Sequence, residues 1–212
     1  MSRQDTRTRI LLTSLQLFNE VGEPNTTTND IADETDISPG NLHYHFRRKS
    51  DLIDALLAEF QVDARNLLAT PVPADDADAI DAFWGFVHLL LETLTAYRFL
   101  IRDNETLIAT YPQVERALRG FSRGLLASIQ LRMQSLRNCG ALQMADADAE
   151  VVGRNIAVIA LFSQRFDALS GRGAAADITA LRIARSMLGV ILPYSSPEAA
   201  PLLQALAEQY RA

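Results

Sequence analysis

Cysteine is almost absent from this 212-residue sequence, which contains only Cys139. A single cysteine forms no internal disulfide bond and supplies too few thiolates for a structural zinc site, so the chain fits a reducing compartment. The N-terminal residues do not resemble a secretory signal peptide, and the longest apolar runs, such as residues 156–162, are too short to cross a bilayer. We therefore expect a cytoplasmic protein without a membrane partner.

Catalytic motifs are also missing: there is no glycine-rich phosphate loop, no pair of catalytic carboxylates and no nucleophile motif. His43 and His45 lie two residues apart, so on a helix they point in different directions and cannot share a metal ion. Their neighbours Asn41, Ser50 and Asp51 match no catalytic arrangement. We predict a protein that is not an enzyme and that needs no cofactor or metal.

Basic residues are fewer than acidic ones, 20 against 26, and the formal net charge is −6. Affinity for phosphate comes from cationic side chains that displace counterions, so this balance alone argues against nucleic acid. The cations are clustered, however, at residues 3–9 and 47–49, with acidic residues 30–36 between the clusters. Charge by itself leaves nucleic-acid binding undecided.

Most of the chain shows the periodicity of amphipathic helices. Apolar residues recur at three- and four-residue steps, proline and glycine interrupt them, and no two-residue alternation typical of a half-buried strand persists. The fold class is therefore predicted to be all-α. Residues 69–79 contain two prolines and several acidic residues, and we expect this run to connect the first four helices to the rest of the chain. The predicted helices cover residues 6–21, 27–34, 38–46, 79–97, 100–110, 113–137, 146–169, 176–192 and 197–210, and a further helix begins near Ser50 and carries apolar residues as far as Phe60.

Two short helices near the N-terminus carry their own start signals. Thr27 and Asp30 are spaced as a capping box, and Ser38 with Pro39 is typical of an N-cap and first helical residue. Between them lies a tight turn at Asp36, and aspartate tolerates a left-handed backbone better than most residues. Two short helices joined by such a turn and packed on a longer first helix are typical of a DNA-binding helix-turn-helix.

The second short helix concentrates polar groups that suit DNA. Each of them alone is more simply a surface residue, but together they supply hydrogen-bonding groups for base edges and cations for phosphates within one patch. These groups are Asn41, His43, Tyr44, His45, Arg47, Arg48 and Lys49. We therefore predict an N-terminal three-helix DNA-binding domain over residues 1–50, followed by a C-terminal helical bundle over residues 51–212.

The segment "TTTNDIADETDISPGNLHYHFRRKSDLIDALL", residues 26–57, resembles the N-terminal signature of the tetracycline-repressor-like (TetR/AcrR) family of bacterial transcriptional regulators. The resemblance covers about residues 8–57, and "GNLHYHF" is its most specific part. Thr35 and Asp36 depart from the alanine and glycine usual there, and His43 replaces a common tyrosine. The resemblance implies phosphate contacts from Thr27, Thr28, His45 and Lys49, and groove contacts from Ser38, Gly40, Asn41, His43 and Tyr44.

Aromatic residues are frequent in the part of the chain that follows residue 79. Their helical spacing is typical of ordinary core, but members of the resembling family keep an effector pocket inside the C-terminal bundle. The resemblance therefore implies a mostly apolar cavity lined by some of these residues. The candidates, with two polar groups among them, are Trp84, Phe86, His88, Phe99, Arg102, Phe121, Phe162 and Phe166.

The last two long helices, residues 146–169 and 176–192, carry apolar faces. A helix-turn-helix monomer reads only a few base pairs, so specificity generally requires a two-fold dimer on a palindromic site. In the resembling family such a pair of helices forms the dimer interface; alternatively, both helices close the core of one monomer. The candidate interface residues are Val152, Ile156, Ile159, Leu181, Ala184 and Leu188.

These patterns predict a sequence-specific DNA-binding transcriptional regulator. The resemblance implies a homodimeric repressor that binds a palindromic double-stranded operator, uses residues 51–212 for effector binding and dimerisation, and is released by a small, mostly apolar effector. The alternative is an all-α small-molecule binding or sequestering protein with a vestigial DNA-binding module. An all-α enzyme that uses His43 or His88 is a third hypothesis.

Overall fold

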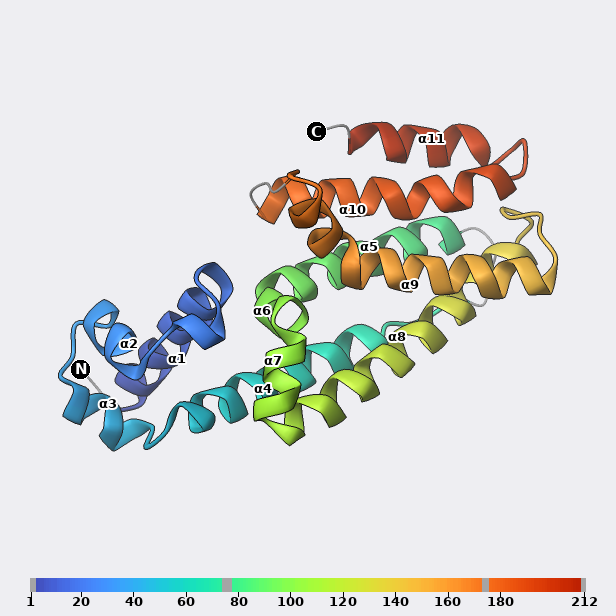
Figure 1. The fold of residues 1–212 in the computed structure, drawn as a ribbon. Coiled ribbons are helices and arrows are strands. Elements are labelled where there is room, and N and C mark those ends of the chain that lie inside the picture. The colour runs from blue at the N-terminus through green and yellow to red at the C-terminus, as the bar shows by residue number, and fades with distance from the viewer. Residues whose placement is uncertain (1–2, 74–77, 173–175, 211–212) are drawn as a thin grey trace. The chain divides into compact units, whose positions relative to one another are not determined.

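The computed structural model describes residues 3–73, 78–172 and 176–210, and its regular elements are helices (Figure 1). One isolated antiparallel bridge joins Leu142 to Ser195. The all-α prediction is confirmed. The helices are α1 Arg3–Glu20, α2 Thr28–Glu34, α3 Pro39–His45, α4 Lys49–Leu68, α5 Ala79–Ala96, α6 Arg98–Arg102, α7 Asn104–Thr110, α8 Pro112–Asn138, α9 Asp146–Leu169, α10 Ala176–Ile191 and α11 Ala200–Gln209, with short 3-10 helices η1 Glu23–Asn25 and η3 Leu192–Tyr194.

The helix predicted over residues 100–110 is wrong, because the chain breaks at Asp103 into α6 and α7. At this break, the Asp103 carboxylate accepts hydrogen bonds from the Glu23 N–H at 3.1 Å and from Arg102 Nε at 2.7 Å. The predicted joint over residues 69–79 is not helical at residues 69–73, and its residues 74–77 lie outside the described part of the chain.

The chain forms two compact units. The first comprises Met1–Ala64 and Ala96–Arg119, and the second comprises Arg65–Thr95 and Gly120–Ala212. Helices α4, α5 and α8 each contribute residues to both units. The first unit therefore contains α1 to α3 with α6 and α7, whereas the second contains α9 to α11.

The core of the first unit is built where the amphipathic faces of its helices meet. Phe18 of α1 is fully buried, and its ring lies 5.5 Å from that of Phe99 of α6. Ile31 of α2, Leu42 of α3 and Leu52 of α4 are also buried. Because α2 and α3 bury only one or two apolar residues each, their positions depend on packing against α1 and α4.

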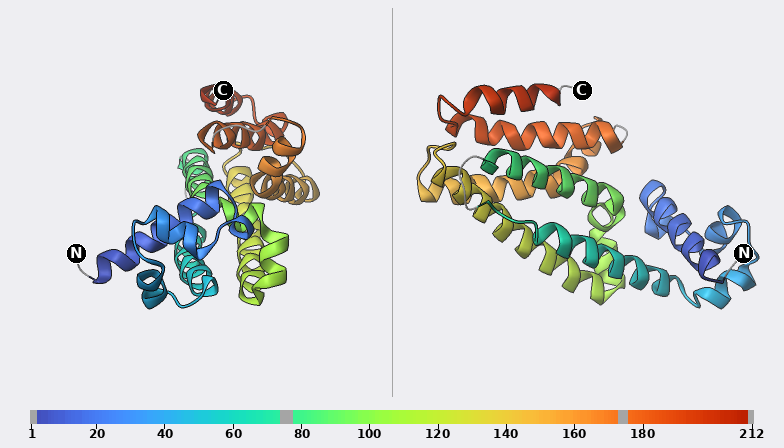
Figure 2. Two further views of the ribbon diagram at one scale, coloured as in Figure 1. Left: turned by 60° about the vertical axis from the view of Figure 1, so that its left-hand side comes forward. Right: turned by 180° about the vertical axis from the view of Figure 1, so that it is seen from behind.

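The second unit is a layered helix bundle. In the views of Figures 1 and 2, α9 and α10 lie side by side and α11 packs against α10. Helix α5 is long and apolar enough to cross a membrane by length and composition alone, but Phe83, Phe86 and Leu90 on it are buried in this bundle. Helix α8 approaches α4 closely at Gly124, where a Cβ atom would lie 2.7 Å from Leu68 Cδ1.

A buried arginine ties α8 to the end of α4 within this unit. Arg132 donates to the backbone oxygen of Thr70 at 2.9 Å and to the side-chain oxygen of Ser128 at 2.7 Å. Its guanidinium lies 3.9 Å from the ring centroid of Phe86, and its Nε has no hydrogen-bond partner. Burial lowers the pKa of Arg132. Oxygens of Thr70 and Ser128 and the face of the Phe86 ring therefore compensate the guanidinium charge.

Candidate nucleic-acid interface

Helix α2 begins with the predicted capping box. The Thr27 hydroxyl accepts from the Asp30 N–H at 3.2 Å, and the Asp30 carboxylate accepts from the Thr27 N–H at 2.7 Å. These two hydrogen bonds satisfy backbone donors that a helix start otherwise leaves unpaired. The hydrogen bond from the Thr27 backbone is the main cause of the lowered pKa of Asp30. Thr27 is exposed and Thr28 is half-buried at this helix start.

The turn between α2 and α3 uses a left-handed aspartate. Asp36 has a φ of 55°, a conformation in which the backbone of an L-residue is strained. The Ile37 N–H reaches back to the Ala32 carbonyl at 3.0 Å, and the Thr35 hydroxyl donates to the Ile31 carbonyl at 2.6 Å. The turn therefore closes with aspartate where the family pattern has glycine, as the sequence predicted.

Helix α3 presents one face to its neighbours and the other to solvent. Its N-cap is Ser38, whose hydroxyl accepts from the Asn41 N–H at 3.2 Å. Leu42 and the following Phe46 are buried one helical turn apart. Since these two residues fix the inner face, the opposite face carries the residues predicted to contact the groove. Ser38, Gly40, Asn41 and His43 are exposed, and Tyr44 is 64% exposed.

The end of α3 supplies cations beside this face. Arg47 and Arg48 are exposed, and the ring of the half-buried His45 lies 5.3 Å from that of Tyr44 in an edge contact. The Arg7 guanidinium lies 4.7 Å from the ring centroid of Phe46 and adds a cation from α1. The structure therefore brings together an exposed polar helix face and exposed cations, an arrangement that suits a major groove and its phosphates.

Lys49 is placed differently from these residues. Its ammonium donates to the backbone oxygen of Glu23 at 2.5 Å and pairs with Glu23 Oε1 at 2.8 Å. Glu23 is only 4% exposed, and its Oε1 also accepts from the Tyr111 hydroxyl at 2.8 Å. Neither Glu23 nor Tyr111 was predicted to contact Lys49, because the three residues are far apart in the chain.

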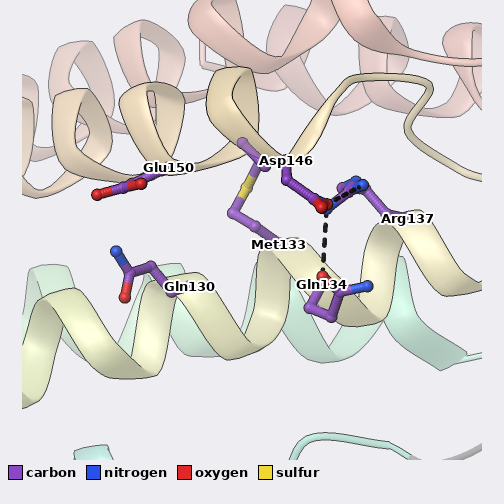
Figure 3. Close-up of a pocket in the computed structure, with 7 residues that line it drawn as sticks. Gln130, Met133, Gln134, Arg137, Asp146 and Glu150 are labelled. Atoms are coloured by element: carbon purple, nitrogen blue, oxygen red, sulfur yellow. Dashed lines mark hydrogen bonds and ion pairs between the residues drawn. The ribbon is translucent and has the colours of Figure 1, made fainter.

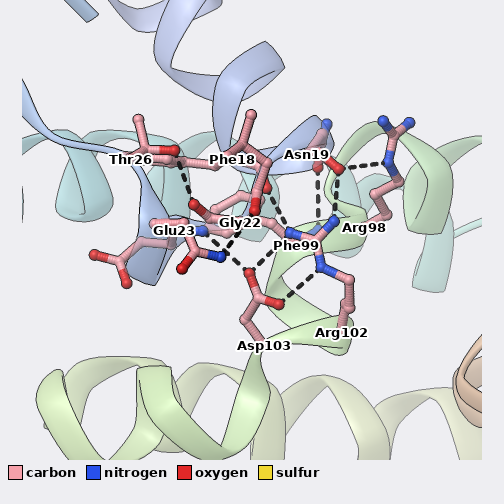
Figure 4. Close-up of polar contacts among 11 residues, drawn as sticks. Phe18, Asn19, Gly22, Glu23, Thr26, Arg98, Phe99, Arg102 and Asp103 are labelled. Carbon is pink, nitrogen blue, oxygen red and sulfur yellow. Dashed lines mark hydrogen bonds and ion pairs between the residues drawn. The ribbon is translucent and has the colours of Figure 1, made fainter. Parts of the chain in front are cut away.

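The loop that holds Glu23 is anchored by a polar network from α6 and from Asp103, which accepts from the Glu23 N–H at 3.1 Å (Figure 4). Arg102 donates to the carbonyl oxygens of Phe18 and Asn19 at 2.6 and 2.7 Å at the end of α1, where the Gly22 N–H also donates to Phe18 and Arg98 also donates to Asn19. The Asn19 side chain donates to the Ala96 carbonyl at 2.7 Å and accepts from the Phe99 N–H at 3.1 Å. These contacts connect the end of α1 to α6 within the first unit.

Comparisons with known proteins identify the family. Residues 10–56 match the family model described as "Bacterial regulatory proteins, tetR family", and residues 59–203 match the model described as "Bacterial transcriptional repressor". The chain belongs to the TetR family. It is a DNA-binding, ligand-responsive transcriptional regulator of a family of non-enzymatic transcription factors, and the alternative of a binding protein with a vestigial DNA-binding module is not favoured.

Individual relatives agree with this assignment. The chain is 32% identical to the class C tetracycline repressor protein of Escherichia coli over 160 residues, which cover 70% of this chain and 71% of that protein. It is 36% identical to the HTH-type regulator UidR of Escherichia coli K12, over 66% of this chain and 70% of UidR. The crystal structure of a TetR-family regulator from Marinobacter aquaeolei VT8 aligns over all of both chains with a TM-score of 0.84 and 31% identity.

In this TetR-family regulator, the eight residues predicted to line an effector pocket are divided between the two units. Phe99 is buried against α1 and Arg102 caps α1, so both belong to the core and network of the first unit. In the second unit, Phe86 and Phe121 are buried. The remaining residues are partly exposed or exposed: Trp84 and His88 contact Tyr210, whereas Phe162 and Phe166 face solvent on α9.

A pocket that the sequence analysis missed lies in the second unit between α8 and α9 (Figure 3). It has a volume of about 340 Å³, and Met133 and Ala149 are its apolar contributions. Its polar lining residues are three or four positions apart on each helix, so they lie on one helix face. The sequence-based prediction of the pocket considered mainly aromatic residues and therefore did not include them. These are Gln130, Gln134, Arg137, Asp146 and Glu150. Arg137 and Asp146 form an ion pair of 2.6 Å across the pocket's edge.

The residues predicted at the dimer interface face mostly inward. Val152 and Ile156 of α9 and Ala184 and Leu188 of α10 are buried within one chain, whereas Ile159 and Leu181 are half-buried. The four buried residues therefore close the core of the protomer, which is the alternative the sequence left open. A different set of α9 residues is exposed: Val151, Val158, Phe162, Phe166 and Leu169.

Proposed function

We propose that the exposed face of α3 reads a palindromic double-stranded operator in the major groove. One observation carries this proposal: Leu42 and Phe46 bury one side of a capped helix and leave Asn41, His43 and Tyr44 on the other. In this proposal residues 1–50 form the DNA-binding domain and residues 51–212 the regulatory and dimerisation domain. The proposed groove contacts are Ser38, Gly40, Asn41, His43 and Tyr44, and the proposed phosphate contacts are Thr27, Thr28, His45, Arg47 and Arg48.

The protein acts as a homodimer through the exposed apolar residues of α9. Val151, Val158, Phe162, Phe166 and Leu169 are separated by 7, 4, 4 and 3 residues, spacings that place them along one side of a helix. A row of exposed apolar side chains on a helix marks a protein contact, and a two-fold dimer is what a palindromic operator requires.

An effector releases the protein from the operator if it binds the state with low affinity for DNA more tightly than the state that binds the operator. Repression in the cytoplasm then depends on the ratio of the effector's affinities for the two states. The pocket between α8 and α9 is a candidate site in the second unit, and its amide and carboxylate groups suit a polar compound better than the mostly apolar effector predicted from the sequence. Titration calorimetry with candidate effectors, with and without operator DNA, tests this coupling.

The test of operator reading is fluorescence anisotropy on DNA from the gene's own upstream region and on a scrambled duplex. We expect the upstream duplex to bind at least about a thousandfold more tightly, which is within the usual range for specific recognition. Tyr44→Ala lowers this ratio because it removes a groove contact. Equal binding of both duplexes, together with no selected sequence from a random library, contradicts the proposal.

A further inference from the structure

The ammonium of Lys49 is committed to the interior of the first unit. An ammonium has three N–H donors, and this one contacts both the backbone oxygen and the carboxylate of Glu23, at 2.5 and 2.8 Å. It also lies 5.7 Å from the ring centroid of Phe18, within the range of a cation–π contact. The Lys49 side chain is 24% exposed and that of Glu23 is 5% exposed. Little of this charge is therefore directed at solvent.

Glu23 is equally committed. Its carboxylate accepts a hydrogen bond of 2.8 Å from the hydroxyl of Tyr111, the residue that follows α7. Its backbone N–H donates to the Asp103 carboxylate at 3.1 Å. Burial, followed by the contact with Glu23, raises the pKa of Tyr111, so its hydroxyl stays protonated beside the carboxylate even in moderately alkaline solution. If Lys49 moved away to a phosphate, a buried carboxylate would lose its cation, which costs far more than breaking an exposed ion pair.

We propose that Lys49 is a positioning residue, which locks the first turn of α4 to the loop after α1 through Glu23 and does not neutralise an operator phosphate. The exposed Arg47 and Arg48 carry the phosphate contacts beside α3 instead. This assignment rests on the proposed operator binding, and it departs from the phosphate contact that the family resemblance implies for Lys49. Because Tyr111 shares the Glu23 carboxylate, the same junction connects the end of α7 to the start of α4.

The salt dependence of DNA binding separates the two roles. Each lost phosphate contact flattens the plot of log affinity against log salt concentration by about 0.9. We expect Lys49→Met to weaken binding to the operator and to a scrambled duplex by the same factor, with the slope unchanged. Arg47→Met is the matched control and flattens the slope by about 0.9 per subunit. Flattening by Lys49→Met overturns the positioning role, and an unchanged slope in Arg47→Met overturns the role of Arg47.

A substitution at Glu23 gives a second test that retains the lysine. If Lys49 were a phosphate anchor that Glu23 competes for, Glu23→Gln would strengthen operator binding and steepen the salt slope. A positioning role predicts the opposite: Glu23→Gln weakens operator binding at an unchanged slope, because the first turn of α4 is less firmly held. Stronger binding by Glu23→Gln overturns the proposal even where Lys49→Met does not fold.

Thermal unfolding of the full chain without DNA separates failure of this proposal from failure of operator binding. Lys49→Met and Glu23→Gln each break the same buried pair, so the double variant is expected to unfold at no lower temperature than Lys49→Met alone. Additive losses in the double variant overturn the proposed lock. If the wild-type chain shows no preference for the operator, the proposed function is contradicted. The unfolding experiment still tests the Lys49–Glu23 pair in that case, because it uses no DNA.

Discussion

At the scale of single residues, Asp36 shows how a side chain and a backbone conformation conflict. A φ of 55° suits glycine, and any Cβ atom there adds strain. We expect Asp36→Gly to raise the free energy of unfolding by about 0.5–1 kcal/mol and Asp36→Ala to lower it by a similar amount. Urea unfolding measures both.

Asp36→Asn is the control for the charge at this position, because asparagine also tolerates the left-handed region. Its stability is expected to stay close to that of the wild type. If Asp36→Ala were as stable as Asp36→Gly, the turn would not depend on this backbone conformation.

Asp30 makes the start of α2 sensitive to acid. Its folded-state pKa is lowered by the hydrogen bond from the Thr27 N–H, so the contribution of the cap is present above the ordinary value of 3.8 and is lost as the pH falls through the lowered pKa. We expect the Thr27 amide resonance in an NMR titration to shift with a midpoint below 3.8. Asp30→Asn removes this titration and Asp33→Asn leaves it; a midpoint at or above 3.8 contradicts the capping box.

At the scale of elements, Arg132 joins α8 to the end of α4. Arg132→Ala removes the hydrogen bonds to Thr70 and Ser128 and the contact with Phe86, so we expect a loss of about 2–4 kcal/mol in unfolding free energy. The exposed Arg123 on the same helix is the matched control, and Arg123→Ala is expected to stay within about 0.5 kcal/mol of the wild type. Equal effects of both substitutions in chemical denaturation contradict the buried contact.

The starts of α2 and α3 were predicted from the sequence, and the break between α6 and α7 was not. Thr27 and Ser38 cap their helices through hydrogen bonds to residues three positions ahead, so the signal lies in a few neighbouring letters. The break at Asp103 has no such signal, since its cause is a hydrogen bond to Glu23, which is 80 residues away. Long-range partners decide such breaks, and local periodicity does not record them.

At the scale of the whole molecule, the exposed residues of α9 are expected to hold the dimer together. Phe166 is 68% exposed in the single chain, and Phe166→Glu places a charge in the proposed interface. We expect light scattering to show a dimer for the wild type and a monomer for Phe166→Glu. Leu12→Glu is the matched control, because Leu12 is 60% exposed on α1, and it is expected to remain dimeric. A dimeric Phe166→Glu variant contradicts the assignment of the interface to this face.

The sequence by itself determined the all-α fold class, the caps of α2 and α3 and the family resemblance, because helical period, capping residues and the motif over residues 26–57 are local properties of the chain. Only the tertiary structure decided which side of α9 is buried and that Lys49 pairs with Glu23. The periodicity of apolar residues shows only that a helix has an apolar side, and α9 has apolar residues on more than one of its sides. Which of them become core, and which cation is drawn inward, depends on neighbours that folding brings from distant parts of the chain.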